Sequence, residues 1–189
     1  TAMASGTAAW GYLGLLALAI NFAGFAGLWV FFERIAVERG FSADFTSLWL
    51  AVGLITSGVG PLAAAVLGDR LGRVLPIAFG MLLALVALGV LASGVDQARY
   101  ALVLFTLPLA YYFAISYVMA VIAAADTTGK IAGLMAFSLA VGAGTGPALF
   151  GMIKDMGGPV LMVMGACILL GGILIVVVAR AAVEPENQE

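Results

Sequence analysis

The chain has 189 residues, of which 64% are hydrophobic and only 10% are charged. Because a soluble domain is about a quarter charged, this composition offers too little polar surface for a water-soluble globule and predicts an integral membrane protein. Ten acidic residues nearly balance eight basic ones, there is no histidine, and Cys167 is the single cysteine. These counts argue against nucleic-acid binding, an internal disulfide and histidine-based catalysis, so we expect neither an enzyme nor a metal or cofactor site.

Six long apolar segments follow one another along the chain, separated by short connections that carry nearly all the charge. A helix of about 20 apolar residues crosses a bilayer, and none of the segments alternates in polarity as the strands of a membrane barrel do. We therefore expect an all-α, polytopic membrane protein with a linker at 1–9, a six-helix bundle at 10–180 and a polar tail at 181–189. The predicted transmembrane helices cover residues 10–32, 45–68, 74–95, 100–125, 131–153 and 156–179.

The first predicted span carries an amide at its centre and two charges at its end. Asn21 is the midpoint of the apolar run, where an amide is costly unless another helix, a water-filled cavity or a ligand bonds it. We interpret it as a candidate for solute binding; the alternative is a bond to a neighbouring backbone carbonyl. Glu33 and Arg34 are interpreted as an interface-anchored ion pair or, alternatively, as an outer gate or proton site. Trp29 is interpreted as an anchor at the membrane interface; the alternative is a role in solute binding.

A short pattern of glycine and proline occurs twice, 86 residues apart. Gly-Val-Gly-Pro at 58–61 recurs as Gly-Thr-Gly-Pro at 144–147, and an aspartate follows each proline, at Asp69 and Asp155. In a six-span chain the two copies cross the membrane in opposite directions, which predicts a three-plus-three inverted repeat of the kind found in secondary transporters. The alternative is that small residues and proline kinks serve helix packing alone. The residues concerned are Gly58, Gly60, Pro61, Gly142, Gly146 and Pro147.

The connection after the second span places one carboxylate and two guanidinium groups on a tight turn. Asp69, Arg70 and Arg73 can pair with the ends and loops of neighbouring helices. Gly72 can take the left-handed conformation that such a turn needs. Contacts of this kind hold one face of a bundle shut and must break when it opens, so we expect these four residues to form a gate. Asp126 is expected to cap the fifth span or, alternatively, to pair with the gate arginines.

The fourth predicted span carries a stripe of polar and aromatic side chains near its middle. Tyr111 and Tyr112 lie there, and Ser116 follows Tyr112 by one helical turn. Hydroxyl groups and aromatic faces together suit a small organic solute. The expected substrate site comprises Asn21, Tyr111, Tyr112, Ser116 and Tyr117; alternatively, the tyrosines pack between helices.

Residues 65–73 resemble the loop signature of the major facilitator superfamily, Gly-x-x-x-Asp-Arg-x-Gly-Arg. The four gate residues match this signature, whereas Ala65 stands in place of the leading glycine and Val74 in place of a trailing basic residue. The glycines of the fifth span are similar to a glycine-rich motif of antiporters in that superfamily. Its members normally have twelve helices, so the resemblance implies half of such a fold. Because the span at 100–125 lacks an arginine, helices seven to twelve fit better than the first six.

The resemblance implies the C-terminal half of a secondary active transporter that moves a small organic solute across the cell (inner) membrane by alternating access. Its partners would be the lipid bilayer and a second six-helix bundle, either a missing N-terminal half or a second copy. Both ends and the gate loop would be cytoplasmic, although four basic residues on each side leave the orientation undecided by charge. The alternatives are a non-transporting membrane scaffold or subunit, and a half-size transporter that works as a homodimer.

Overall fold

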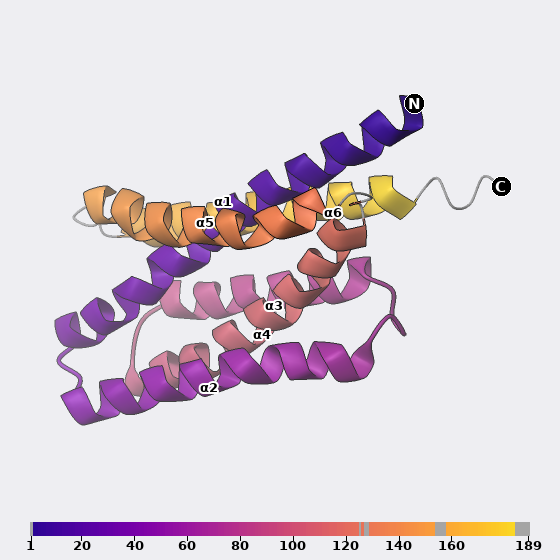
Figure 1. The fold of residues 1–189 in the computed structure, drawn as a ribbon. Helices are drawn as coiled ribbons and strands as arrows, with labels where there is room; N and C mark the ends of the chain where they lie inside the picture. The colour runs from indigo at the N-terminus through magenta and orange to yellow at the C-terminus, as the bar shows by residue number, and fades with distance from the viewer. Residues whose placement is uncertain (1, 125, 127–128, 154–157, 184–189) are drawn as a thin grey trace.

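A computed structural model describes residues 2–124, 126, 129–153 and 158–183. All regular structure in these ranges is helical, and consecutive helices run antiparallel, so that the start of α1 and the end of α6 lie at the same end of the bundle (Figure 1). The helices are α1 (Ala2–Glu38), α2 (Ala43–Leu67), α3 (Val74–Ala92), α4 (Gln97–Ala124), α5 (Lys130–Ile153) and α6 (Gly158–Val183).

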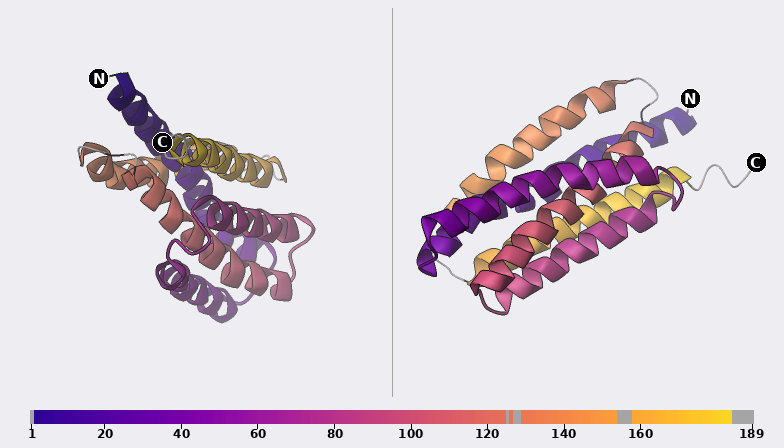
Figure 2. Two further views of the ribbon diagram at one scale, coloured as in Figure 1. Left: turned by 90° about the vertical axis from the view of Figure 1, so that its right-hand side faces the viewer. Right: turned by 90° about the horizontal axis from the view of Figure 1, so that it is seen from below.

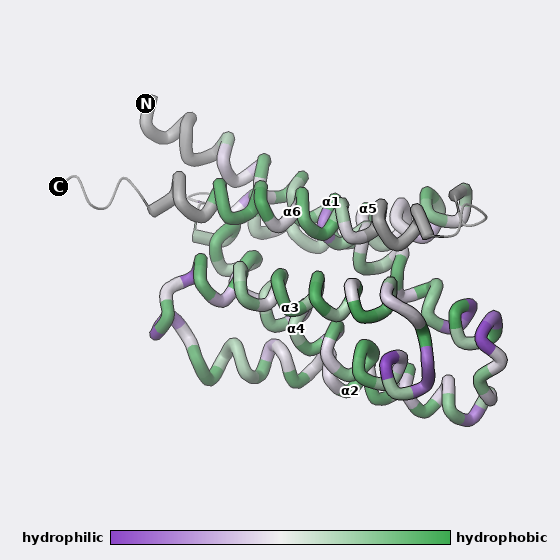
Figure 3. Tube along the Cα trace, turned by 180° about the vertical axis from the view of Figure 1, so that it is seen from behind, coloured by the Kyte–Doolittle hydropathy of each residue, from purple (hydrophilic) through white to green (hydrophobic). Residues whose placement is uncertain are grey.

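The structure confirms the expected all-α, multi-pass architecture. Five helices, α1 to α5, are long and apolar enough to cross a membrane, and α6 contains an apolar stretch at Gly165–Val178 within the part that is described. Strongly hydrophilic residues gather at the two ends of the bundle (Figure 3). The chain is therefore a multi-pass membrane protein, as its composition predicts.

The helices α1 and α6 extend beyond the expected spans. The helix α1 begins at Ala2, so residues 2–9 are helical, because this alanine-rich stretch contains nothing that stops a helix. It continues past residue 32 and ends at Glu38, two residues before Gly40, whose φ of 70° is incompatible with a continued helix. At the other end α6 extends to Val183, and so includes the first residues of the expected tail.

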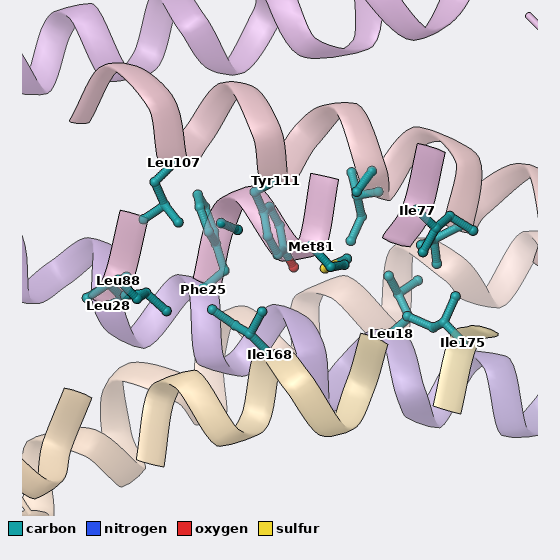
Figure 4. Close-up of a cluster of buried hydrophobic side chains, with 14 of the residues drawn as sticks. Leu18, Phe25, Leu28, Ile77, Met81, Leu88, Leu107, Tyr111, Ile168 and Ile175 are labelled. Carbon is teal, nitrogen blue, oxygen red and sulfur yellow. The ribbon is translucent and has the colours of Figure 1, made fainter. Parts of the chain in front are cut away.

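The helices pack in two groups that are joined along α3 and α6. The helix α1 packs on α5 and α6, whereas α4 packs on α2 and α3 (Figures 1 and 2). Buried apolar side chains from α1, α3, α4 and α6 fill the space between the groups, among them Leu18, Ile77, Leu107 and Ile168 (Figure 4). This core fixes the relative positions of the helices that surround the candidate site.

Two glycines of the repeated pattern bring helix backbones into direct contact. A Cβ added to Gly60 in α2 would lie 2.5 Å from the carbonyl oxygen of Leu109 in α4. A Cβ added to Gly146 in α5 would overlap the carbonyl oxygen of Ala23 in α1. Only glycine allows helices to approach this closely, and short separations maximise the dispersion contacts that hold helices together in lipid.

The other glycines of the pattern differ in their surroundings. Gly142 also lies against α1, where an added Cβ would be 2.7 Å from the carbonyl oxygen of Ala19. Gly58 and Gly144 have no neighbouring atom within 4 Å of an added Cβ, so neither brings two helices of this bundle into close contact. In each copy of the motif, the second glycine is in close contact with another helix, and the first glycine, two residues earlier, is not.

These paired positions predict opposite effects of the same substitution. Gly60→Ala and Gly146→Ala should lower the melting temperature of the purified protein, because the new methyl group collides with the backbone of the facing helix. Gly58→Ala and Gly144→Ala should leave it unchanged or raise it slightly, since alanine favours helix by about 0.5–1 kcal/mol over glycine. Equal effects at all four positions, measured by thermal unfolding in detergent, would contradict the packing described here.

Candidate solute-binding groove

An open groove of about 270 Å³ lies among α1, α2, α4 and α5. Its walls are aromatic, aliphatic and proline side chains, and its polar side-chain groups are the hydroxyl groups of a serine and a tyrosine and the indole N–H of Trp29. Among the described residues, no acidic or basic side chain lines it. The lining consists of Phe22, Phe25, Ala26, Trp29, Val30, Leu54, Ser57, Pro108, Tyr112, Ala143 and Pro147.

Aromatic rings form a continuous wall along the groove. The ring of Phe25 stacks on Trp29 with 6.2 Å between centroids and meets Tyr112 edge to face at 5.4 Å. Phe22 contacts Phe25 at 6.1 Å on the same helix. These rings stand three to four residues apart along α1, so the helical repeat places them on one face.

Tyr112 differs from the other tyrosines of α4 in the state of its hydroxyl group. Tyr100 donates a hydrogen bond to the carbonyl of Phe32 at 3.1 Å. Tyr111 and Tyr117 likewise donate to oxygen atoms of other helices or their ends, at 2.7 and 2.9 Å. The Tyr112 hydroxyl makes no hydrogen bond within the described part of the chain, and it is the one tyrosine that lines the groove. It is therefore available to a ligand.

Prolines free two backbone carbonyls in the groove lining. Pro61 in α2 and Pro147 in α5 have no N–H to donate to the carbonyl four residues earlier, which belongs to Ser57 and Ala143 respectively. Both Ser57 and Ala143 line the groove. The hydroxyl of Ser57 is itself occupied, since it donates to the carbonyl of Leu54 at 2.6 Å. The groove thus combines an unbonded hydroxyl group with two carbonyls that lack their helical partner.

The structure places Asn21 and Tyr111, two of the expected substrate residues, in the core beside the groove lining. Both side chains are fully buried and bonded in the core: the Asn21 amide donates to the carbonyl of Ile168 at 2.9 Å and accepts from Tyr111 at 2.7 Å. The amide nitrogen also lies 3.6 Å from the sulfur of Met81. Tyr111 points toward Met81 in this cluster (Figure 4). Asn21 therefore links four helices, in line with the alternative reading of its sequence position.

Ser116 and Tyr117 do not line the groove, and their hydroxyl groups bond the backbone. Ser116 donates to the carbonyl of Tyr112 at 2.9 Å, within α4. Tyr117 donates to the carbonyl of Gly68, just after α2. Of the five expected substrate residues, Tyr112 alone lines the groove. The sequence signal that was missed is the spacing of Phe22, Phe25 and Trp29; Trp29 was interpreted as an interface anchor instead.

The expected gate loop is tied to the end of α4. Arg73 pairs with Asp69 at 3.3 Å and donates to the carbonyl of Ala120 at 3.4 Å. Tyr117 bonds the same connection at Gly68, and Gly72 takes a φ of 64°, the left-handed conformation expected for it. These contacts of Arg73 and Tyr117 hold the α2–α3 connection on α4, and we call them the clamp. Arg70 is exposed and makes no ion pair within the described ranges, so it adds nothing to this clamp.

The remaining charged candidates lie at helix ends, away from the groove. A carboxylate oxygen of Asp126 accepts a hydrogen bond from the backbone N–H of Ala132 at 2.8 Å, which is the capping role expected at the start of α5. Arg34 pairs with Glu38 at 2.7 Å, and Glu33 is exposed at the end of α1. Asp155, the second aspartate of the repeat, lies outside the described residues.

No family model, curated protein or solved structure matches this chain. The resemblance to the major facilitator superfamily therefore rests on the loop signature and the glycine pattern.

The contrast between Tyr111 and Tyr112 predicts different costs for the same conservative substitution. Tyr111→Phe should lower the free energy of unfolding by about 1 kcal/mol, because it leaves the buried oxygen of Asn21 without a donor. Tyr112→Phe should leave stability unchanged, since the hydroxyl that it removes bonds nothing in the described part of the chain. Unfolding of both variants in mixed micelles measures the difference, and a larger loss for Tyr112→Phe would contradict the hydrogen-bond assignment.

Proposed function

We propose that this chain is the six-helix half of a secondary active transporter of the major facilitator type, which moves a small organic solute by alternating access. It works with a second six-helix bundle, which is either a separate half or a second copy. The gate loop and both chain ends face the cytoplasm, and the groove among α1, α2, α4 and α5 holds the solute.

The observation that carries this proposal is a pair of equivalent contacts. Gly60 lies on Leu109, and Gly146 lies on Ala23. Gly146 follows Gly60 by 86 residues, and Leu109 follows Ala23 by the same 86. One contact is therefore converted into the other by exchanging α1–α3 with α4–α6. This supports an inverted repeat that extends beyond the short sequence motif.

The third helix of each half also packs on the first helix of the other half, although the partner residues are not equivalent at the 86-residue offset, since Ala110 and Asn21 are 89 residues apart. Gly80 of α3 lies against Ala110 in α4, and Gly171 of α6 lies against Asn21 in α1. The two glycines are 91 residues apart. Residues of α3 and α6 that line an apolar groove between these two helices pair at the same spacing, for example Ile77 with Ile168 and Leu82 with Ile173. The ends of α2 and α5, at Leu67 and Ile153, still correspond at an offset of 86, so the extra five positions lie after the end of α5.

The packing of whole helices also fits an inverted repeat. The first helix of each half packs on the second and third helices of the other half: α1 on α5 and α6, and α4 on α2 and α3.

A stacked pair of rings supports a two-fold axis between the halves. Phe25 and Tyr111 are 86 residues apart, and their rings stack at 4.0 Å with only 11° between their planes. Two equivalent residues touch each other when they lie next to the axis that relates them. The axis then passes close to the aromatic wall of the groove.

An inverted repeat supports a transport function because it gives one fold two open states. When two halves of opposite orientation exchange conformations, the same fold supplies both an inward-open and an outward-open state. Transporter solutes bind near the midplane, where proline-interrupted helices offer backbone groups to them. The groove has these features, since prolines in three helices line it or free a carbonyl in it.

The proposal is tested by the side from which water reaches the groove. In a Cys167→Ser background, Ser57→Cys in sealed vesicles should react with a membrane-impermeant maleimide added outside, and also with the reagent enclosed inside. Leu82→Cys, on the apolar outer surface of α3, is the control that should react from neither side, because a thiol needs water to ionise.

The clamp at the gate loop should determine how much of the protein has its groove open to each side of the membrane. Arg73→Ala removes the bonds to Asp69 and Ala120, and should raise labelling of Ser57→Cys from the side of the loop several-fold. Arg70→Ala is the matched control and should have a smaller effect. Labelling from one face alone, with no response to Arg73→Ala, would contradict alternating access and favour a non-transporting subunit.

A further inference from the structure

We infer that the groove binds uncharged, planar aromatic solutes that carry a hydrogen-bond donor. As a statement about what is transported, this inference rests on the proposed function; as a statement about binding, it stands on the groove alone. Three properties of the lining lead to it: the lack of charge, the shape of the walls, and the kind of polar group that is left without a partner.

The lack of charge excludes ionic solutes as the preferred ligands. The described lining contains no acidic or basic side chain. An ion that leaves water for an apolar site loses its hydration, and it needs a counter-charge to recover that loss. The charged residues that the structure describes lie at the helix ends, at the gate loop and near Glu33. A neutral solute avoids this cost.

The shape of the walls selects flat, small molecules. Phe25, Trp29 and Tyr112 line the groove and pack on one another by face and by edge, and flat aromatic solutes pack well against such rings. The rings of prolines add further flat surface. A volume of about 270 Å³ lies at the small end of ligand sites, which range over about 300–1,000 Å³, and so suits a solute of one or two fused rings.

The unpartnered polar groups of the groove favour a hydrogen-bond donor, because acceptors outnumber the one group that can only donate, the indole N–H of Trp29. The carbonyls of Ser57 and Ala143 can only accept, and each lacks its helical N–H because of the proline four residues later. The Tyr112 hydroxyl can accept or donate. Two acceptors of this kind favour a solute with an N–H or O–H over an isostere that lacks one, since the isostere would leave desolvated carbonyls unpaired.

Binding of tritiated indole to the 189-residue chain in lipid nanodiscs tests this inference, with empty nanodiscs as the background. Indole should bind saturably, and unlabelled indole should displace it. 1-Methylindole, which lacks the N–H, should compete about three- to tenfold more weakly, as expected for one lost hydrogen bond. The anion indole-3-acetate and the cation tryptamine should compete at least tenfold more weakly than indole.

Two variants place the binding in the groove. Ala143→Phe fills the groove from the exposed surface of α5 and should abolish saturable binding, whereas Ala140→Phe on the same helix, outside the groove lining, should preserve it. Tyr112→Phe should weaken the binding of ligands that bond its hydroxyl, and Tyr12→Phe, on exposed α1 surface outside the groove, should not. Retained folding of each variant is checked by its melting temperature.

The outcomes separate this inference from the proposed function. Absence of saturable indole binding, equal competition by 1-methylindole, or tighter binding of either ion would overturn the inference. Groove-dependent indole binding without maleimide labelling from both faces leaves the ligand class intact and contradicts transport. Labelling from both faces without indole binding leaves transport intact and contradicts the ligand class.

Discussion

The close approach of helix backbones at Gly60 and Gly146 is the constraint on which the rest of the structure depends. Lipid is as apolar as the helix surfaces, so the hydrophobic effect does not drive helices together in a membrane, and packing at short distance has to do so. By removing one side chain in each of α2 and α5, the sequence lets these helices lie directly on α4 and α1. The same two contacts bring the aromatic residues of α1 opposite the prolines of α4 and α5.

The polar groups inside the bundle divide into two kinds. Those of the core are bonded: Asn21 and Tyr111 satisfy each other and the backbone of α6, and within the described residues no buried side-chain oxygen or nitrogen lacks a partner. Those of the groove include a free hydroxyl and two carbonyls beside prolines. Since an unbonded polar group in an apolar setting is costly, its persistence at an open groove marks a place where a ligand or water completes the bonding.

The sequence predicted the helices better than the site. Apolar length alone gave six helices, and the tight turn at Gly72 followed from the charge and glycine pattern of residues 69–73. The burial of Asn21 and Tyr111 could not be predicted, because a polar residue at the centre of a span can face a ligand or another helix, and spacing within one helix does not distinguish the two. Residues 86 apart in the chain, such as Phe25 and Tyr111, gain their meaning only when the fold brings them into contact.

The central claim is that one groove, built on an inverted repeat, is open to water from each face of the membrane in turn. A nitroxide label at Ala143, in sealed vesicles, measures this through its collisions with a water-soluble nickel chelate. The account predicts enhanced relaxation when the chelate is outside and also when it is enclosed inside, while a label at Leu82 responds to lipid-dissolved oxygen alone. A label at Ala143 that responds only to oxygen, or to the chelate on a single side, would contradict it.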